Sequence, residues 1–301
     1  MQRQGSLEEK TGEGGSASPG GQWSFDEVEL LRLTWMGGRG KVTSPPTMNL
    51  INEELFGFQE TSKPKDHLEI LPVSVIDIQP LGKQGIRGDD NHDKKSSRSG
   101  YSAFPHEIAE LCSSLFLKNK SLVVDPFAGW GERGSYCKKH DVPYVGFDIS
   151  TRAIENALTK FGVSNTLADS RFVQVPEHDG LFTCPPYWGL EKYQSDDGLD
   201  KIKNWTSFID QYKAVLKRFS DKAKPDSTYC IMTGDWRDSG IYYDLTYQTE
   251  KIMDELGFQP FDKIVVSRLK ISKVKIMLPQ AKRLGYTVKV HENLSVFKKN
   301  K

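Results

Sequence analysis

The chain has 301 residues, of which 37% are hydrophobic and 27% charged, and its formal net charge is +1. That is enough apolar material for one substantial core. No apolar run is long enough to span a membrane, and no basic-then-apolar leader is present, so we expect a cytoplasmic protein. The four cysteines, at positions 112, 137, 184 and 230, form neither a Cys-x-x-Cys pair nor a zinc spacing, so we expect reduced thiols and no metal.

The N-terminal third is expected to lie outside the catalytic domain. Residues 1–22 are rich in Gly, Ser and Glu and are predicted to be a disordered tail. Residues 23–100 form an irregular extension, in which Ser24–Trp35 has the spacing of a small docking helix. Within it, Leu71–Ile78 alternates like a strand, and the polar stretch 82–100 predicts a flexible loop.

From residue 101 to 301 apolar strands alternate with helical stretches. This rhythm predicts a catalytic domain with a Rossmann-like, doubly wound and mainly parallel α/β sheet of seven strands, with an antiparallel edge strand. No helix is expected between the last two strands. The predicted strands are 121–125, 143–148, 166–168, 180–184, 228–234, 260–267 and 287–297, and the clearest helices are 205–219 and 243–256.

A glycine-containing loop follows the first of these strands. The apolar run 121–124 ends at Asp125, and Gly129 and Gly131 then allow a sharp turn and a close approach to a ligand before a helix begins. The pattern departs from the dinucleotide fingerprint, because these glycines follow an acidic residue. Asp125 would repel a pyrophosphate at this place. A cationic or zwitterionic ligand fits better, and S-adenosylmethionine has positive charge where Asp125 is negative.

Two further carboxylates follow the next strands. Asp148 ends the second strand, where an acidic side chain can accept hydrogen bonds from both ribose hydroxyls. Asp169 follows the third strand and is placed to meet an adenine amino group. Aspartates at strand ends are also common as helix caps and turn residues, and this alternative applies to each position.

The segment from Thr183 to Trp188 reads Thr-Cys-Pro-Pro-Tyr-Trp and carries the chemistry. An exocyclic amine on a base is a poor nucleophile, so a catalyst must accept hydrogen bonds from it. A rigid Pro-Pro turn at a strand end can aim the Pro185 carbonyl at such an amine. Tyr187 can stack on a base rotated out of its helix, and Trp188 can widen that platform. The alternative is a turn with two core aromatics.

With these two motifs in this order, the chain resembles class I S-adenosylmethionine-dependent methyltransferases of the DNA amino type, which modify adenine N6 or cytosine N4. The resemblance covers about residues 101–298, and a looser similarity to phage-encoded DNA modification methylases extends back to Val73. It implies catalytic roles for Thr183, Cys184, Pro185, Pro186 and Tyr187, and cofactor contacts from Phe104, Pro105, Asp125, Pro126, Phe127, Ala128, Gly129, Gly131, Asp148 and Asp169.

Cys184 departs from the family pattern. The family has Asp, Asn or Ser before the two prolines, and that oxygen is the main acceptor for the target amine. A thiol is a weak acceptor. Either the thiol works poorly, Thr183 or a water substitutes for it, or the chemistry is covalent C5 methylation of cytosine, in which a cysteine beside a proline attacks the ring.

A basic stretch lies near the C-terminus. From Lys263 to Val290 there is no acidic residue, while basic and apolar side chains are interleaved. This favours a phosphate-contacting surface, and the alternative is a solvated face on two strands and a loop. The candidate nucleic-acid contacts are Trp188, Arg268, Lys270, Lys273, Lys275, Lys282 and Arg283, with Lys289 in the same stretch.

The sequence therefore predicts a methyltransferase that uses S-adenosylmethionine to methylate an exocyclic amine of adenine or cytosine in DNA. Methylation of an RNA guanine amine or of a protein glutamine amide is one alternative. A non-catalytic nucleic-acid-binding protein on the same scaffold is another, motivated by Cys184. The target base, the recognition sequence and the oligomeric state are not encoded in any pattern that we can interpret.

Overall fold

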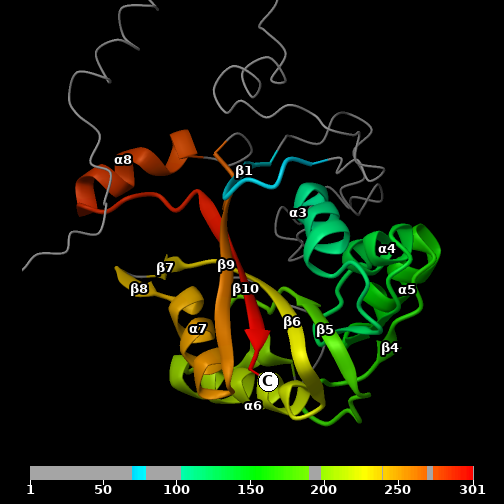
Figure 1. Ribbon diagram of the computed structural model, residues 1–301. Helices are drawn as coiled ribbons and strands as arrows, with labels where there is room; N and C mark the ends of the chain where they lie inside the picture. The colour runs from blue at the N-terminus through cyan, green and yellow to red at the C-terminus, as the bar shows by residue number, and fades with distance from the viewer. Residues whose placement is uncertain (1–69, 79–102, 190–197, 239, 270–273, 301) are drawn as a thin grey trace, which may run out of the picture. The chain divides into compact units, whose positions relative to one another are not determined.

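A computed structural model describes most of the chain from residue 70 onward, all of it within the compact unit of residues 66–301 (Figure 1). The predicted tail 1–22, the docking helix Ser24–Trp35 and the loop 82–100 lie outside the described residues, so they remain predictions. The described ranges are 70–78, 103–189, 198–238, 240–269 and 274–300.

A sheet of eight strands forms the centre of this unit, in the order β1-β9-β10-β6-β5-β2-β3-β4 (Figure 1). A separate two-stranded hairpin is formed by β7 and β8. The strands are β1 (Val75–Asp77), β2 (Val123–Asp125), β3 (Tyr144–Asp148), β4 (Thr166–Leu167), β5 (His178–Thr183), β6 (Ala223–Thr233), β7 (Trp236–Asp238), β8 (Ile241–Tyr243), β9 (Phe258–Ser267) and β10 (His291–Lys299).

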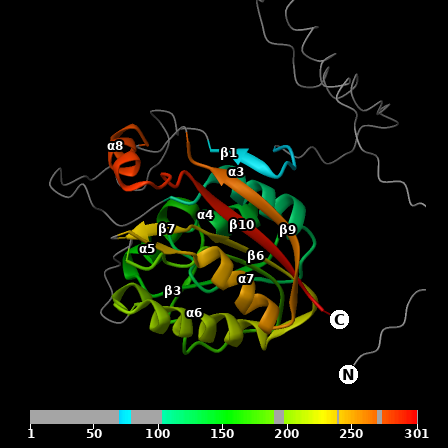
Figure 2. The same ribbon diagram turned by 90° about the vertical axis from the view of Figure 1, so that its left-hand side faces the viewer.

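Helices cover both faces of the sheet, with α6 and α7 on one side and α3, α4 and α5 on the other (Figures 1 and 2). Helix α3 continues as a π-helical turn, Cys112–Phe116. A short 3-10 turn, Leu199–Lys201, precedes α6. The helices are α3 (His106–Leu111), α4 (Glu132–Lys139), α5 (Thr151–Phe161), α6 (Trp205–Ser220), α7 (Leu245–Glu255) and α8 (Val274–Leu284).

The sheet has a hydrophobic core on each of its faces, and alternate side chains of the central strands contribute to each core. In β6, Tyr229 and Ile231 pack with α6 and α7, whereas Cys230 and Met232 pack with α3 on the opposite face. Successive side chains of a strand point to opposite faces, so a strand buried on both sides reads as a continuous apolar run. The short β2 follows the same rule, and it is therefore fully buried.

The predicted fold class, a doubly wound and mainly parallel α/β sheet, is confirmed. Two details differ from the prediction. The sheet has eight strands, because β1 from the N-terminal extension pairs in parallel with β9. The antiparallel strand, β10, lies between β6 and β9, and is third from the edge.

The expectation that no helix separates the last two strands is wrong, because α8 lies between β9 and β10. The segment contains basic and apolar residues and Pro279, and the prediction treated it as the loop between the strands 260–267 and 287–297. Most of the helix is solvent-exposed, including Ile276 at 75% and Met277 at 51%. The apolar positions of α8 follow a helical spacing, but only Ala281 is buried; they are Val274, Met277, Leu278, Ala281 and Leu284.

Candidate functional site

An open cleft lies at the carboxyl ends of the parallel strands and brings both sequence motifs together. Its empty volume is about 1050 Å³ with open solvent included. Ligands of open α/β sheets bind at this rim, because the loops that follow the strands converge there. The predicted residues that line it are Phe104, Pro105, Pro126, Phe127, Gly129, Asp148, Asp169, Cys184, Pro185, Pro186, Tyr187 and Arg268.

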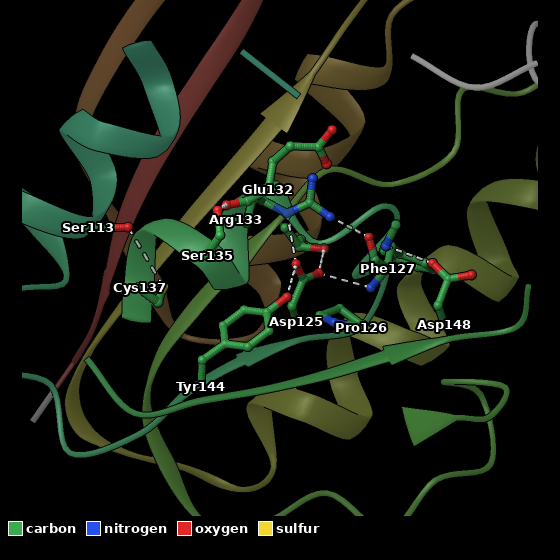
Figure 3. A network of polar contacts seen from close by, with 12 residues as sticks. Ser113, Asp125, Pro126, Phe127, Glu132, Arg133, Ser135, Cys137, Tyr144 and Asp148 are labelled. Atoms are coloured by element: carbon green, nitrogen blue, oxygen red, sulfur yellow. Dashed lines mark hydrogen bonds and ion pairs between the residues drawn. The ribbon is translucent and has the colours of Figure 1, made fainter. Parts of the chain in front are cut away.

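Asp125 lies beneath this cleft, and its side chain is not part of the lining. It is completely buried and accepts hydrogen bonds from four protein groups (Figure 3). The partners are the Phe127 backbone N–H at 3.0 Å, Thr183 Oγ1 at 2.7 Å, Tyr144 Oη at 2.9 Å and Arg133 Nε at 2.7 Å. A carboxylate offers about four acceptor positions. Asp125 therefore holds the loop in place. The positive charge of a ligand in the cleft must be bound by other residues than Asp125, contrary to our expectation.

Arg133, on the first turn of α4, ties the loop to Asp125. Its guanidinium also donates to the Phe127 carbonyl (Figure 3). Burial lowers the pKa of Arg133, but the charge of Asp125 outweighs this effect and the pKa lies above its usual value. A buried ion pair of this kind is sensitive to the loss of either partner.

The two glycines of the loop have left-handed backbone conformations, φ +57° at Gly129 and +102° at Gly131. Gly131 is also in close contact with α5, where an added Cβ would lie 2.8 Å from the Cβ of Ala157. Only glycine adopts such a conformation at this distance without strain. Ala128, which precedes Gly129, is buried and does not line the cleft.

Carboxylates give the cleft an acidic wall. Asp148 accepts backbone hydrogen bonds from Gly129 at 2.7 Å and Ser150 at 2.8 Å, and burial nevertheless raises its pKa. Asp169 is paired with Arg171 at 2.5 Å, so part of its charge is already neutralised. Glu132, which sequence reasoning did not single out, also lines the cleft, and burial raises its pKa.

The Pro-Pro turn follows β5 directly. Cys184, Pro185, Pro186 and Tyr187 face the cleft, and the Cys184 Sγ lies 3.6 Å from the Tyr187 hydroxyl. Tyr187 stacks on Trp236 with 6.4 Å between ring centroids and 14° between planes, and burial raises its pKa. Thr183 does not line the cleft, because its hydroxyl is buried against Asp125.

Trp188 does not extend the Tyr187 surface of the cleft as we expected. It packs edge-on against Trp205 and against Tyr243, and its indole N–H donates to the Ile202 carbonyl at 2.6 Å. Trp188 is half-buried in this aromatic cluster, and its nucleic-acid contact stays a prediction.

A second ion pair closes the cleft beside Tyr187. Arg268 follows β9, and Glu292 lies near the start of the antiparallel β10, so both reach the same rim. Arg268 donates from Nε to Glu292 Oε2 at 2.6 Å, and its terminal nitrogen is also 2.6 Å from that oxygen. Arg268 therefore belongs to the cleft, although the sequence grouped it with a basic surface.

The remaining basic residues of that surface separate into two groups. Lys275, Lys282 and Arg283 are exposed on α8. Lys289 lies 4.7 Å above the Tyr242 ring of the β7–β8 hairpin. Lys270 and Lys273 fall outside the described residues.

The lining chemistry favours a ligand that carries positive charge and apolar surface. Five carboxylates line the cleft against two arginines, both of which have carboxylate partners. Aromatic and aliphatic side chains complete the wall, among them Phe104 and Ile149. This set of acceptors fits S-adenosylmethionine, which carries positive charge and hydroxyl donors, and it fits a pyrophosphate poorly. The carboxylates are Glu132, Asp148, Asp169, Asp200 and Glu292.

No protein-family model and no curated protein matches this chain. Among solved structures, it is similar to TrmN from Thermus thermophilus, with 16% identity, a TM-score of 0.43 and coverage of 66% of this chain. The chain spans 50% of the TrmN chain. It is also similar to the N-methyltransferase NodS from Bradyrhizobium japonicum WM9, with 14% identity, a TM-score of 0.44 and coverage of 65% of this chain and 94% of NodS.

A third similar structure is magnesium protoporphyrin IX methyltransferase from Synechocystis PCC 6803, at 10% identity and a TM-score of 0.42 over 65% of this chain and 79% of that one. Likenesses of this size leave the substrate and cofactor to be argued from the residues of this chain. Within the described residues, no cluster of three or more side chains suited to a metal ion occurs. No helix in the same part of the chain is long and apolar enough to cross a membrane.

Proposed function

We propose that this protein transfers a methyl group from S-adenosylmethionine to the exocyclic amine of adenine or cytosine in DNA. The observation that carries the proposal is that the glycine loop and the Pro-Pro-Tyr turn, which lie more than fifty residues apart in the sequence, line one cleft. A methyl donor held by the first motif would then meet an amine held by the second.

The cofactor assignment rests on the chemistry of the wall. Asp148 has its carboxylate fixed by two backbone N–H groups, which leaves acceptor capacity for a ribose diol. Glu132 and Asp169 add negative charge for the ammonium and sulfonium groups or for an adenine amine. When bound, the cofactor supplies a methyl group on a positively charged sulfur. The residues of the chain supply position and electrostatic alignment, which are the main sources of acceleration in such a transfer.

The amine assignment rests on the turn. Pro185 and Pro186 fix the backbone after β5, so a carbonyl can accept a hydrogen bond from an amine without an N–H group competing. Tyr187 presents a ring that is already held by Trp236, and an extruded base can stack on such a surface.

The nucleic-acid assignment rests on α8. This helix follows Arg268, which lines the cleft, and it exposes three basic and no acidic residues. We expect Lys282→Ala combined with Arg283→Ala to weaken duplex binding about equally for all sequences. The slope of log affinity against log salt should become shallower by about 1 to 2. A matched control is Lys217→Ala combined with Arg218→Ala on α6, the same charge change on a helix elsewhere in the fold.

The deciding experiment measures transfer of labelled methyl to unmethylated DNA, RNA and protein pools, followed by nucleoside analysis. N6-methyladenine or N4-methylcytosine in DNA supports the proposal, and label only in RNA or protein replaces the substrate. Asp148→Asn should weaken cofactor binding in calorimetry, since the amide keeps one carbonyl oxygen and loses the charge. Cofactor binding without transfer to any pool would refute catalysis.

One observation favours a second chemistry. Cys184 lines the cleft, whereas Cys112, Cys137 and Cys230 are buried. A cysteine at this place can attack C6 of cytosine and methylate C5 through a covalent adduct. Cys184→Ser separates the two: amine methylation should be retained or raised by the hydroxyl, whereas C5 methylation should be abolished.

A further inference from the structure

The turn lacks a strong side-chain acceptor of its own. Cys184 carries a thiol, and Thr183 is committed to Asp125 at 2.7 Å. An amine that gains a methyl group must also lose a proton, and a thiol is a weak acceptor for it. If the proposed function holds, another group at this end of the cleft has to accept that proton.

Glu292 has the required position. It lines the cleft with Cys184 and Tyr187, and the Tyr187 hydroxyl lowers the pKa of its carboxyl. The same hydroxyl lies 3.6 Å from Cys184 Sγ, so polar groups of the turn and of β10 lie at the same end of the cleft. Figure 1 shows β10 beside β6, the strand that precedes Trp236.

Its hydrogen bonding also leaves room for a substrate. Arg268 makes both of its close contacts with Glu292 Oε2. A carboxylate has about four lone-pair positions, so these two contacts leave acceptor capacity for a substrate. Burial raises the pKa of Glu292 more than Arg268 and Tyr187 lower it, which makes the carboxylate a stronger base than an exposed one.

We propose that Glu292 is a catalytic residue that accepts the proton from the substrate amine, in place of the side-chain oxygen that the turn lacks. This proposal rests on the proposed function. Arg268 is a positioning residue for Glu292, because its two contacts fix the orientation of the carboxylate.

The proton step balances as follows. The amine nitrogen forms its bond to the methyl carbon with its lone pair, and the electron pair of the broken carbon–sulfur bond stays on sulfur. One N–H bond of the methylated nitrogen then breaks and its electron pair stays on nitrogen. The proton forms an O–H bond with Glu292, which becomes neutral and later releases the proton to solvent. The loss of one positive charge on sulfur matches the loss of one negative charge on Glu292.

The test compares Glu292→Gln with Glu292→Asp in single-turnover methyl transfer over a range of pH. Glutamine keeps the size of the side chain, but it cannot accept a proton. We expect its rate to fall about 10²- to 10⁴-fold. The fall in kcat/KM toward acid pH should disappear in this variant and persist in Glu292→Asp. Glu255→Gln on α7, which removes an exposed ion pair with Lys213 of α6, is the matched control and should behave as wild type.

A readout independent of turnover is the titration of the Glu292 carboxyl by carbon NMR in the unliganded protein, assigned by its loss in Glu292→Gln. The pKa of the acid limb of kcat/KM reports the free enzyme, so the two values should agree. Their disagreement, or a rate for Glu292→Gln within threefold of wild type, would overturn the proposal.

Two other outcomes are also decisive. If Glu292 only orients Tyr187, then Tyr187→Phe and Glu292→Gln should slow the reaction alike, and both should keep the acid limb, which overturns a catalytic role. If the wild type transfers no methyl to any amine, the proposed function fails and this proposal fails with it. Wild-type transfer with an unaltered Glu292→Gln variant refutes the role of Glu292 alone.

Discussion

Replacing Asp125 with asparagine tests whether this residue maintains the fold of the loop. The substitution keeps the shape of the side chain but removes the charge that faces Arg133, a residue only 5% exposed. Removing one partner of a buried ion pair costs about 3–5 kcal/mol, because the other charge stays buried without compensation. The amide has one accepting oxygen where the carboxylate has two, so its NH₂ group also faces former donors.

We therefore expect Asp125→Asn to lower the free energy of unfolding by about 3–5 kcal/mol, a large part of the roughly 5–15 kcal/mol of a typical domain. Urea unfolding followed by circular dichroism, without cofactor, measures this directly. The control is Asp221→Asn, which breaks an exposed pair with Lys217 and should cost less than about 1 kcal/mol.

Adding Arg133→Met to Asp125→Asn should restore part of the loss, since it removes the unpaired charge. A loss below about 1 kcal/mol in Asp125→Asn would contradict the structural role. Asp125 would then be open to the ligand contact that the sequence suggested.

Two further predictions concern the same unit. Gly131→Ala should weaken cofactor binding and stability together, by about 1–3 kcal/mol in stability, because its φ is +102° and the new Cβ would meet Ala157; thermal unfolding and calorimetry test this, and Gly240→Ala, with open space around it, separates strain from contact. Burial raises the pKa of Glu110, but hydrogen bonds from Lys139 and His140 outweigh it, so the pKa lies below its usual value. This lowered pKa contributes stability above the unfolded pKa of about 4.5, and the contribution is lost as the pH falls through the folded pKa. In acid-titrated unfolding, Glu110→Gln should lose that dependence, and an unchanged slope would refute it.

The order of strands and helices could be predicted, because each element is indicated by the pattern of residues within its own segment. Buried runs such as 228–234 are apolar on both faces, and such runs identify strands without knowledge of their neighbours. The end of α7 was equally local, since Gly257 has φ +81° directly after Leu256. The positions of the carboxylates at strand ends followed from the topology.

The partners of those residues could not be predicted. Asp125 meets Arg133 in the first turn of the next helix and Thr183 on another strand, and no spacing rule connects the three. Glu292 and Arg268 reach the cleft because β10 runs antiparallel to β9, which joins the end of one strand to the start of the other. Two signals did exist: Glu292 is an acidic residue at the start of an apolar strand, and Arg268 follows the last residue of β9.

The pairing of β1 with β9 has a consequence for how the chain folds. Val75 meets Val265, so β1 is synthesised roughly 190 residues before the strand it joins, and the contact closes one of the longest loops in the domain. Ile76 and Ile78 are buried only in the completed sheet. Until then the edge of β9 is open to pairing with another chain. The edge strand that covers β9 is therefore among the first to be made, and it has to wait for almost the whole domain before its partner exists.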